Sequence, residues 1–238
     1  MARLARVIAV DTPHHITQRG NDRQFVFDSD SDRTVYLQFL LHYCGLHRVT
    51  LAGYCLMPNH VHLIATPQRP TSLSLALKHV HGRYAAYFNA RHSRSGHVWQ
   101  GRYYSCPLDT PHLWAALRYT EMNPVRGGLV VAPQDYQWST AAFHCGLREA
   151  PDGLDLSVWR QAWTPSDWYG YLGAPAGDDE VAEIRRSTHT GRPLGESNFV
   201  EGLEASLRRK LTPNLGGRPR KELLDSGQTA LGLQTGSG

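Results

Sequence analysis

The sequence predicts a domain of mixed helices and strands that is built around an antiparallel hairpin. Val49–Met57 is rich in strand-forming residues and is followed by Pro58 and Asn59 and then by a second apolar strand. A turn this tight between two apolar strands indicates antiparallel pairing. Two segments with apolar residues at helical spacing flank the hairpin, at about 32–45 and 71–90.

The size and charge of the chain limit the classes of protein it can belong to. At 238 residues it can bury a sizeable core, and this length suits one domain with an appendage better than two full domains. The hydrophobic fraction of 41% is slightly low, which indicates a polar or loosely ordered portion. The net charge of +4 is compatible with a nucleic-acid partner without demonstrating one.

The cysteines and the apolar runs indicate where the protein resides. The four cysteines are scattered, so neither a zinc knuckle nor a disulfide framework is expected, and a reducing compartment is favoured. The N-terminal apolar run is too short for a signal peptide, and no apolar stretch is long enough to span a bilayer. We therefore expect a soluble, cytoplasmic protein with no membrane partner.

The strand after the hairpin turn carries two histidines, His60 and His62. Successive strand side chains point to opposite faces, so both imidazoles project together while Val61 and Leu63 point into a core. Two imidazoles side by side on a strand form half of a metal site. The alternative is a polar strand face whose imidazoles are hydrogen-bonded to neighbouring groups.

A later helix offers groups that would complete such a site. We expect it to begin at Thr110 as N-cap, with a first-turn proline, and to stop at Asn123-Pro124. Tyr119 and Asn123 are four residues apart and would share one face. An amide oxygen can ligate a metal ion and a phenol can act as a nucleophile, so all four side chains would meet if this helix packs across the sheet.

Several basic residues are candidates for contact with a nucleic-acid backbone. Arg19 ends a predicted strand over residues 14–20 at a Gly-Asn turn, which could equally be an ordinary turn. The glycine-punctuated segment 96–105 combines tryptophan, glutamine, arginine and tyrosine, which could grip a phosphate and stack a base. The further candidates in the first 148 residues are Lys78, Arg83, Arg102 and Arg126.

The composition changes after residue 148. Tryptophans and tyrosines crowd among prolines and glycines, which predicts an irregular segment wrapped on the core, followed by short helices at about 178–186 and 199–211. The stretch 207–221 is basic, and 217–220 resembles the core of a minor-groove AT-hook; a solvated basic tail is the equal alternative. Residues 225–238 are low in core-forming residues and are expected to be disordered. The DNA-binding candidates here are Arg208, Arg209, Lys210, Arg218 and Arg220.

Three ordered motifs give the chain a resemblance to a known family, the single-tyrosine HUH transposases. It is most similar to the branch of REP-associated tyrosine transposases, which are domesticated bacterial relatives. The similarity runs from about His14 to Leu147, with a weaker part from Ser187 to Lys221. The motifs are Pro58-Asn59-His60-Val61-His62-Leu63, Trp99-Gln100-Gly101-Arg102-Tyr103 and Tyr119-Thr120-Glu121-Met122-Asn123-Pro124-Val125-Arg126.

The resemblance implies a ferredoxin-like α+β fold, with an antiparallel sheet backed by helices. It implies a catalytic domain over residues 1–148, and it is consistent with an extension at 149–224 that carries a basic DNA-binding segment. By the resemblance, His60 and His62 are metal ligands on a central strand, Tyr119 is the nucleophile and Asn123 is the third protein ligand. Some relatives carry glutamine in place of Asn123, and no role is assigned to His14 or His15.

The activity implied is transposase chemistry on single-stranded or hairpin DNA such as a REP element. Tyr119 would attack a phosphodiester, giving a 5′-phosphotyrosine link and a free 3′-hydroxyl, with one covalent link at a time. Mg²⁺ or Mn²⁺ suits a site of mixed nitrogen and oxygen ligands, and zinc is less favoured because no thiolate is present. The protein would act as a monomer or a homodimer.

Two other functions remain open from the sequence. One is a DNA-hairpin binding protein that does not cut, in which the histidines are structural. The other is a metal-dependent phosphodiesterase that uses an activated water and forms no protein–DNA adduct.

Overall fold

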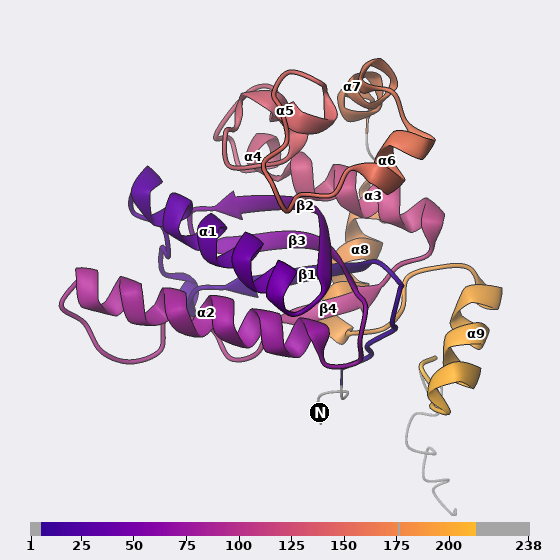
Figure 1. Ribbon diagram of the computed structural model, residues 1–238. Helices are drawn as coiled ribbons and strands as arrows, with labels where there is room; N and C mark the ends of the chain where they lie inside the picture. Colours follow the sequence, from indigo (N-terminus) through magenta and orange to yellow (C-terminus); the bar gives the residue numbers. More distant parts are fainter. Residues whose placement is uncertain (1–5, 176, 213–238) are drawn as a thin grey trace, which may run out of the picture.

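The computed structural model describes residues 6–175 and 177–212, and its centre is a four-stranded antiparallel sheet (Figure 1). The strands lie side by side in the order β2-β3-β1-β4. This order, with helices between the strands, confirms the expected ferredoxin-like α+β fold. The strand bounds are β1 His14–Arg19, β2 Val49–Met57, β3 His60–Pro67 and β4 Tyr104–Pro107.

The predicted hairpin is formed by β2 and β3. Met57 pairs with His60 across the two-residue turn, and the ladder continues to Val49 opposite Pro67, with one irregularity between Leu51 and Gly53. β3 pairs on its other side with β1. The histidines of β3 therefore sit on a central strand, whose backbone is held from both sides.

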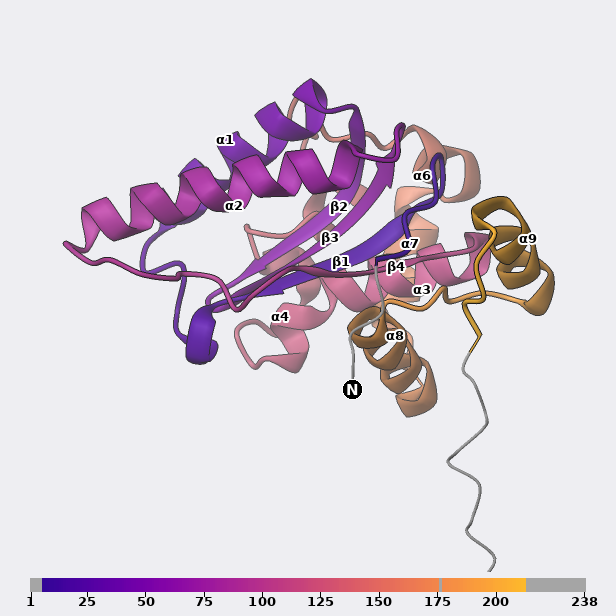
Figure 2. The same ribbon diagram turned by 90° about the horizontal axis from the view of Figure 1, so that it is seen from below.

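One face of the sheet is covered by α1 (Asp30–Leu46) and α2 (Ser72–Arg91), which pack against each other (Figure 2). α1 begins with a capping box, in which Ser29 accepts from the Asp32 backbone and Asp32 accepts from the Ser29 backbone. Thr71 precedes α2 but forms no side-chain cap hydrogen bond. The apolar faces of both helices bury the main core, which includes Ile16, Tyr36, Leu40, Val61, Leu63, Leu77, Tyr84 and Phe88.

The opposite face of the sheet carries α3 (Thr110–Glu121) and the single turn α4 (Asn123–Arg126). The predicted N-cap of this helix was wrong by one residue, because Asp109, not Thr110, accepts the His112 backbone N–H. The expected single helix is also interrupted at Met122, where α3 ends and α4 begins. The backbone of Met122 stays in the right-handed helical region.

The segment after residue 148 is more helical than predicted. Trp159 and Trp168 lie in short helices and are buried in a second apolar core beneath α3, and only Trp163, between the two helices, has an extended backbone. The predicted helices at 178–186 and 199–211 are present with different bounds. The remaining elements are the 3₁₀ turns η1 Asn21–Arg23 and η2 Pro133–Asp135 and the helices α5 Ala141–His144, α6 Ser157–Ala162, α7 Pro165–Gly173, α8 Asp178–Thr190 and α9 Ser197–Leu207.

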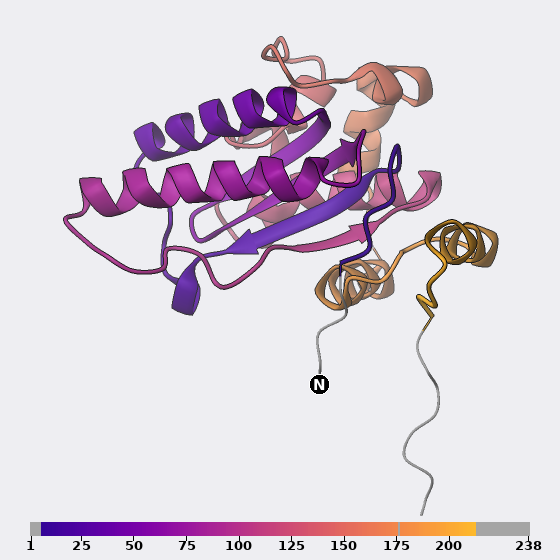
Figure 3. The same ribbon diagram turned by 60° about the horizontal axis from the view of Figure 1, so that its bottom comes forward.

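α8 joins the edge of the sheet rather than standing apart from it. It packs against β4 and β1, and Figure 3 shows it lying below β4 with α9 further along the chain. No helix within residues 6–175 and 177–212 is long and apolar enough to cross a membrane. The AT-hook-like segment with Arg218 and Arg220, and the tail 225–238, lie outside the described residues.

A buried carboxylate anchors the C-terminal end of α3. Glu121 is fully buried and accepts hydrogen bonds from Thr140 Oγ1 at 2.7 Å, His144 Nδ1 at 2.5 Å and Trp168 Nε1 at 2.9 Å. These bonds connect α3 to α5 and α7. Buried polar groups are costly when unpaired, so this arrangement fixes the turn of α3 on which Tyr119 lies.

We expect Glu121→Ala to lower the free energy of unfolding by about 3 kcal/mol, because it strands buried donors from three residues. Glu201→Ala, on the exposed surface of α9, is the control and should change it by less than about 0.5 kcal/mol. Urea unfolding of both variants measures the difference. Equal stability of the two variants would show that the buried network does not hold α3.

Candidate active site

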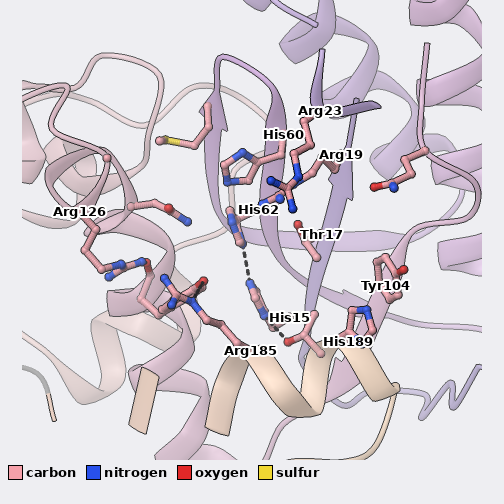
Figure 4. A pocket seen from close by; sticks show the side chains of 16 residues that line it. His15, Thr17, Arg19, Arg23, His60, His62, Tyr104, Arg126, Arg185 and His189 are labelled. Atoms are coloured by element: carbon pink, nitrogen blue, oxygen red, sulfur yellow. Dashed lines mark hydrogen bonds between the residues drawn. The ribbon is translucent and has the colours of Figure 1, made fainter. Parts of the chain in front are cut away.

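A cavity of about 550 Å³ opens between the sheet and the helices α3, α4 and α8. Figure 4 shows His60, His62 and His15 in a row across it, with arginines around them. Alternate residues of β1 and β3 supply the wall formed by the sheet, as the strand periodicity requires. The lining residues are His15, Thr17, Arg19, Arg23, Met57, His60, His62, Gln100, Tyr104, Tyr119, Asn123, Arg126, Gly127, Arg185, Thr188 and His189.

His60 presents a bare ring nitrogen to the cavity. Its Nδ1 lies 2.6 Å from Asn59 Oδ1, and Asn59 Nδ2 donates to the Arg23 carbonyl oxygen, which fixes the orientation of the amide. Because an amide oxygen only accepts, the proton is on His60 Nδ1 and its Nε2 carries a lone pair. Burial, and then the charge of Arg19, lower the pKa of His60 to about 4, so the ring is neutral at neutral pH.

His62 lies deeper, and a third histidine supports it. Its ring centroid is 5.0 Å from that of His60, and its Nδ1 is 2.9 Å from Nε2 of His15. Burial is the main cause that lowers the pKa of His62 well below its usual value and that of His15 to about 3. All three rings are therefore neutral, which is the state that binds a metal ion.

The phenol of Tyr119 is held among these groups. Its ring meets His62 and His15 edge to face, with centroid distances of 5.5 and 5.6 Å. The guanidinium carbon of Arg126 lies 4.2 Å from the ring centroid, and Arg185 Nε donates to the phenol oxygen at 3.2 Å. Two cations therefore contact the tyrosine, one through its ring and one through its oxygen, and both would stabilise a phenolate.

The fourth group, Asn123, lines the same cavity despite the break between α3 and α4. It is 9% exposed, and its side-chain nitrogen has no hydrogen-bond partner among the described residues. An amide without a partner is free to turn its oxygen toward a ligand. The structure thus gathers His60, His62, Tyr119 and Asn123 around one cavity, as the sequence predicted.

The donor set fits a divalent cation with open coordination positions. Two neutral imidazoles with lone pairs available and one amide oxygen would leave further positions for water and phosphate oxygens. Among the described residues no three histidine, cysteine, aspartate or glutamate side chains could hold a metal ion. Any ion here would accordingly depend on the amide and on non-protein oxygens, which suits Mg²⁺ or Mn²⁺ better than zinc.

Only part of the predicted DNA-binding set lies at this cavity. Arg19 and Arg126 line it, and Arg102 is exposed beside a smaller hollow that shares Tyr104 with it. Lys78 and Arg83 are exposed on α2, which covers the opposite face of the sheet. Arg208, Arg209 and Lys210 follow α9 and do not line the cavity. The role of each residue in binding DNA stays a prediction.

Two of the three aromatic residues of the 96–105 segment, Trp99 and Tyr103, are buried instead of facing the cavity, which Tyr104 lines. Trp99 is 8% exposed and Tyr103 is 6% exposed, and both belong to the main core. Trp99 Nε1 donates to the His81 carbonyl oxygen. These two rings are therefore unavailable as a base-stacking platform, whereas Gln100 between them lines the cavity.

Several residues of the cavity were not predicted as site residues from the sequence. His15 could have been found, because His15, Thr17 and Arg19 alternate along β1 and so share the face of Arg19. Arg23 follows in the short turn η1. No local pattern points to Arg185, Thr188 or His189, because they come from α8 in the extension and reach the cavity only through the tertiary fold.

The chain is similar to one family model and to two solved structures. Residues 10–123 match the family model for IS200-like transposases. A solved structure of a REP-associated tyrosine transposase bound to a REP hairpin is similar in fold, with a TM-score of 0.52 and 19% identity over 66% of this chain and 96% of that chain. A candidate transposase from Deinococcus radiodurans R1 has a TM-score of 0.35 and 18% identity over 46% of this chain and 88% of its own. No curated protein matches the chain.

The lowered pKa values predict that the metal-free protein loses stability in mild acid. Four histidines are neutral when the protein is folded but take up protons near pH 6.5 when it is unfolded, namely His14, His15, His60 and His62. Their contribution is complete above about pH 6.5 and is lost as the pH falls toward 4, by up to about 1.4 kcal/mol per pH unit for each histidine. Urea unfolding with a chelator from pH 7 to pH 4 measures the slope.

The matched variants for this experiment are His14→Gln and His42→Gln. His14 is fully buried, so its replacement should make the pH slope shallower, whereas His42 is exposed and its replacement should leave the slope unchanged. A free energy of unfolding that stays constant between pH 6.5 and 4 in the unmodified protein would contradict the assignment of neutral, buried rings.

Proposed function

This chain belongs, through residues 10–123, to the IS200-like transposase family, and from that premise we propose that it cuts and rejoins DNA with Tyr119 as nucleophile. The observation that carries the proposal is the position of the Tyr119 phenol, which contacts two imidazoles and the Arg185 guanidinium in a cationic cavity. A structural tyrosine would not need a guanidinium group at its oxygen. A nucleophile needs a cation near the developing phenolate and an adjacent place for phosphate.

In the proposed step the Tyr119 oxygen attacks the phosphorus of a phosphodiester. The phenol proton passes to solvent, the new oxygen–phosphorus bond forms, and the bond to the 3′ oxygen breaks, which leaves a 3′-hydroxyl after protonation. The product is a 5′-phosphotyrosine, and the reverse attack by a 3′-hydroxyl rejoins the strand. A neutral phenol is a weak nucleophile, and the positive charge of Arg185 at the phenol oxygen would favour the reactive phenolate.

His60, His62 and Asn123 are the residues that would hold a divalent ion. When bound, Mg²⁺ or Mn²⁺ supplies Lewis-acid polarisation of a phosphate oxygen. The neutral state of the two imidazoles supports this role, since no proton has to leave them before they bind the ion.

The proposed substrate is single-stranded or hairpin DNA. Four arginines line the cavity, and planar guanidinium groups bind phosphate oxygens in pairs. The likeness to a REP-associated transposase that was solved with a REP hairpin supports a hairpin of this class as substrate. Binding should weaken steeply with salt because phosphate contacts release counterions. The four arginines are Arg19, Arg23, Arg126 and Arg185.

We propose a bacterial protein that acts in the cytoplasm as a monomer or a homodimer.

We expect Tyr119→Phe to abolish formation of a covalent protein–oligonucleotide adduct with Mn²⁺ and a hairpin oligonucleotide, because it removes the attacking oxygen. Hairpin affinity should change by less than about threefold, since the ring and its arginine contact remain. Tyr104→Phe, which alters the other phenol of the cavity, is the control and should keep the adduct. Denaturing gel electrophoresis and a filter-binding assay measure the two quantities.

The outcomes of this experiment separate the alternatives. An adduct that survives in Tyr119→Phe would remove Tyr119 from the proposed role. Cleavage by the unmodified protein without any adduct would indicate a phosphodiesterase that uses water, and binding without cleavage would indicate a hairpin-binding protein.

Arg185→Gln should slow adduct formation by about 10- to 100-fold, the loss expected for a charge-assisted hydrogen bond to the reacting oxygen. Arg186→Gln removes the same charge from the next residue, which is exposed and paired with Glu183, and should have little effect. Single-turnover rates at saturating hairpin compare the two variants. Equal rates in both would show that Arg185 does not act on the phenol.

A further inference from the structure

The hydrogen bond between His15 and His62 has two mutually exclusive proton arrangements. In the first, His62 Nδ1–H donates to His15 Nε2, and His62 Nε2 is bare. In the second, His15 Nε2–H donates to His62 Nδ1, and the remaining proton of the neutral His62 ring is on Nε2. Only the first arrangement leaves His62 able to bind a cation through Nε2, the nitrogen left free by the bond to His15. The choice is decided at the other nitrogen of His15.

That nitrogen, His15 Nδ1, lies 2.7 Å from the hydroxyl oxygen of Thr188 on α8. A hydroxyl has one proton, and Thr188 donates it to the Ile184 carbonyl oxygen at 2.8 Å, one helical turn back. Thr188 Oγ1 is thus left as an acceptor. The thiol of Cys106 at 3.3 Å is the second group that can donate to it, so one donor bond and two acceptor bonds satisfy the hydroxyl.

These hydrogen bonds determine which nitrogen of His15 and which nitrogen of His62 carries the proton. His15 Nδ1–H donates to Thr188, so His15 Nε2 accepts from His62 Nδ1–H, and His62 Nε2 is bare. We propose that His15 and Thr188 are positioning residues that fix His62 in the tautomer able to bind a divalent cation. The inference deepens the proposed function and rests on it for the identity of His62 as a ligand.

The position of the hydrogen bonds that join His62, His15 and Thr188 supports a role in the site rather than in packing alone. His15 is 1% exposed and Thr188 is 2% exposed, so water does not compete for these bonds. Arg185 precedes Thr188 by three residues on α8 and bonds the Tyr119 oxygen. One face of α8 therefore contacts both Tyr119, the candidate nucleophile, and His15, which is hydrogen-bonded to the candidate metal ligand His62. Partners of metal-binding histidines commonly set ring orientation and protonation in this way.

The test compares Thr188→Val, which removes the acceptor at nearly constant volume, with Thr188→Ser, which keeps it. Thr190→Val is the matched control, because Thr190 is exposed on the same helix and its hydroxyl bonds only helix carbonyl groups. Two readouts are used on the full chain without DNA. Nitrogen-15 NMR of the histidine side chains gives the protonated nitrogen in the metal-free protein, and electron paramagnetic resonance titration gives the affinity for Mn²⁺.

We expect His62 protonated on Nδ1 in the unmodified protein, in Thr188→Ser and in Thr190→Val. In Thr188→Val the proton of His15 moves to Nε2, and that of His62 moves to its own Nε2. The affinity for Mn²⁺ should fall by about tenfold or more in Thr188→Val alone, the usual effect of losing such a partner. Thermal unfolding confirms that each variant is folded.

Two results would overturn the inference. One is a proton on Nε2 of His62 in the unmodified protein, and the other is a Thr188→Val protein with unchanged tautomer and Mn²⁺ affinity. Failure of the proposed function would look different. The unmodified protein would then bind Mn²⁺ no better than His60→Ala does, while the NMR spectra still show His62 protonated on Nδ1. That result would count against the ion and would support the tautomer assignment.

Discussion

The pairing of β1 with β3 is the constraint on which the candidate site depends. His62 lies opposite Thr17 and Arg19 lies opposite His60, so alternate residues of two central strands share one face. On the other face, Ile16, Val61 and Leu63 enter the main core under α1 and α2. A slip of one residue would exchange the two sets, placing imidazoles in an apolar core. The burial of these apolar side chains therefore fixes the face on which the histidines appear.

The second constraint is the placement of α3 against that face. Glu121 holds the end of the helix to α5 and α7 through three buried hydrogen bonds. Tyr119 and Asn123 lie two residues before and two residues after this anchor, so both are positioned by the same turn. The helices of the extension thus serve the site in two ways. α7 secures the anchor, and α8 contacts the phenol and the histidine pair.

Local patterns in the sequence predicted the elements that carry the two histidines and the tyrosine. The hairpin turn and the strand alternation placed His60 and His62, and the four-residue spacing placed Tyr119 near Asn123. The break at Met122 was not predicted, yet it left both residues at the cavity because Met122 stays near helical geometry.

The contributions of α8 could not be predicted in the same way. His15 and Thr188 are 173 positions apart, and no periodicity links residues at that distance. The short helices α6 and α7 were missed because their stability comes from burying tryptophans against α3 rather than from helix propensity. Trp99 was misjudged for a related reason, since its neighbours Tyr36 and Tyr84 are distant in sequence.

In the proposed reaction one phenol, at the junction of β3, α3 and α8, reacts with DNA. The most direct measurement is mass spectrometry of protease-digested protein after reaction with a hairpin oligonucleotide and Mn²⁺. We expect a nucleotide attached through a 5′-phosphate to the peptide that contains Tyr119. Attachment to any other residue, or cleaved DNA with no modified peptide, would contradict it.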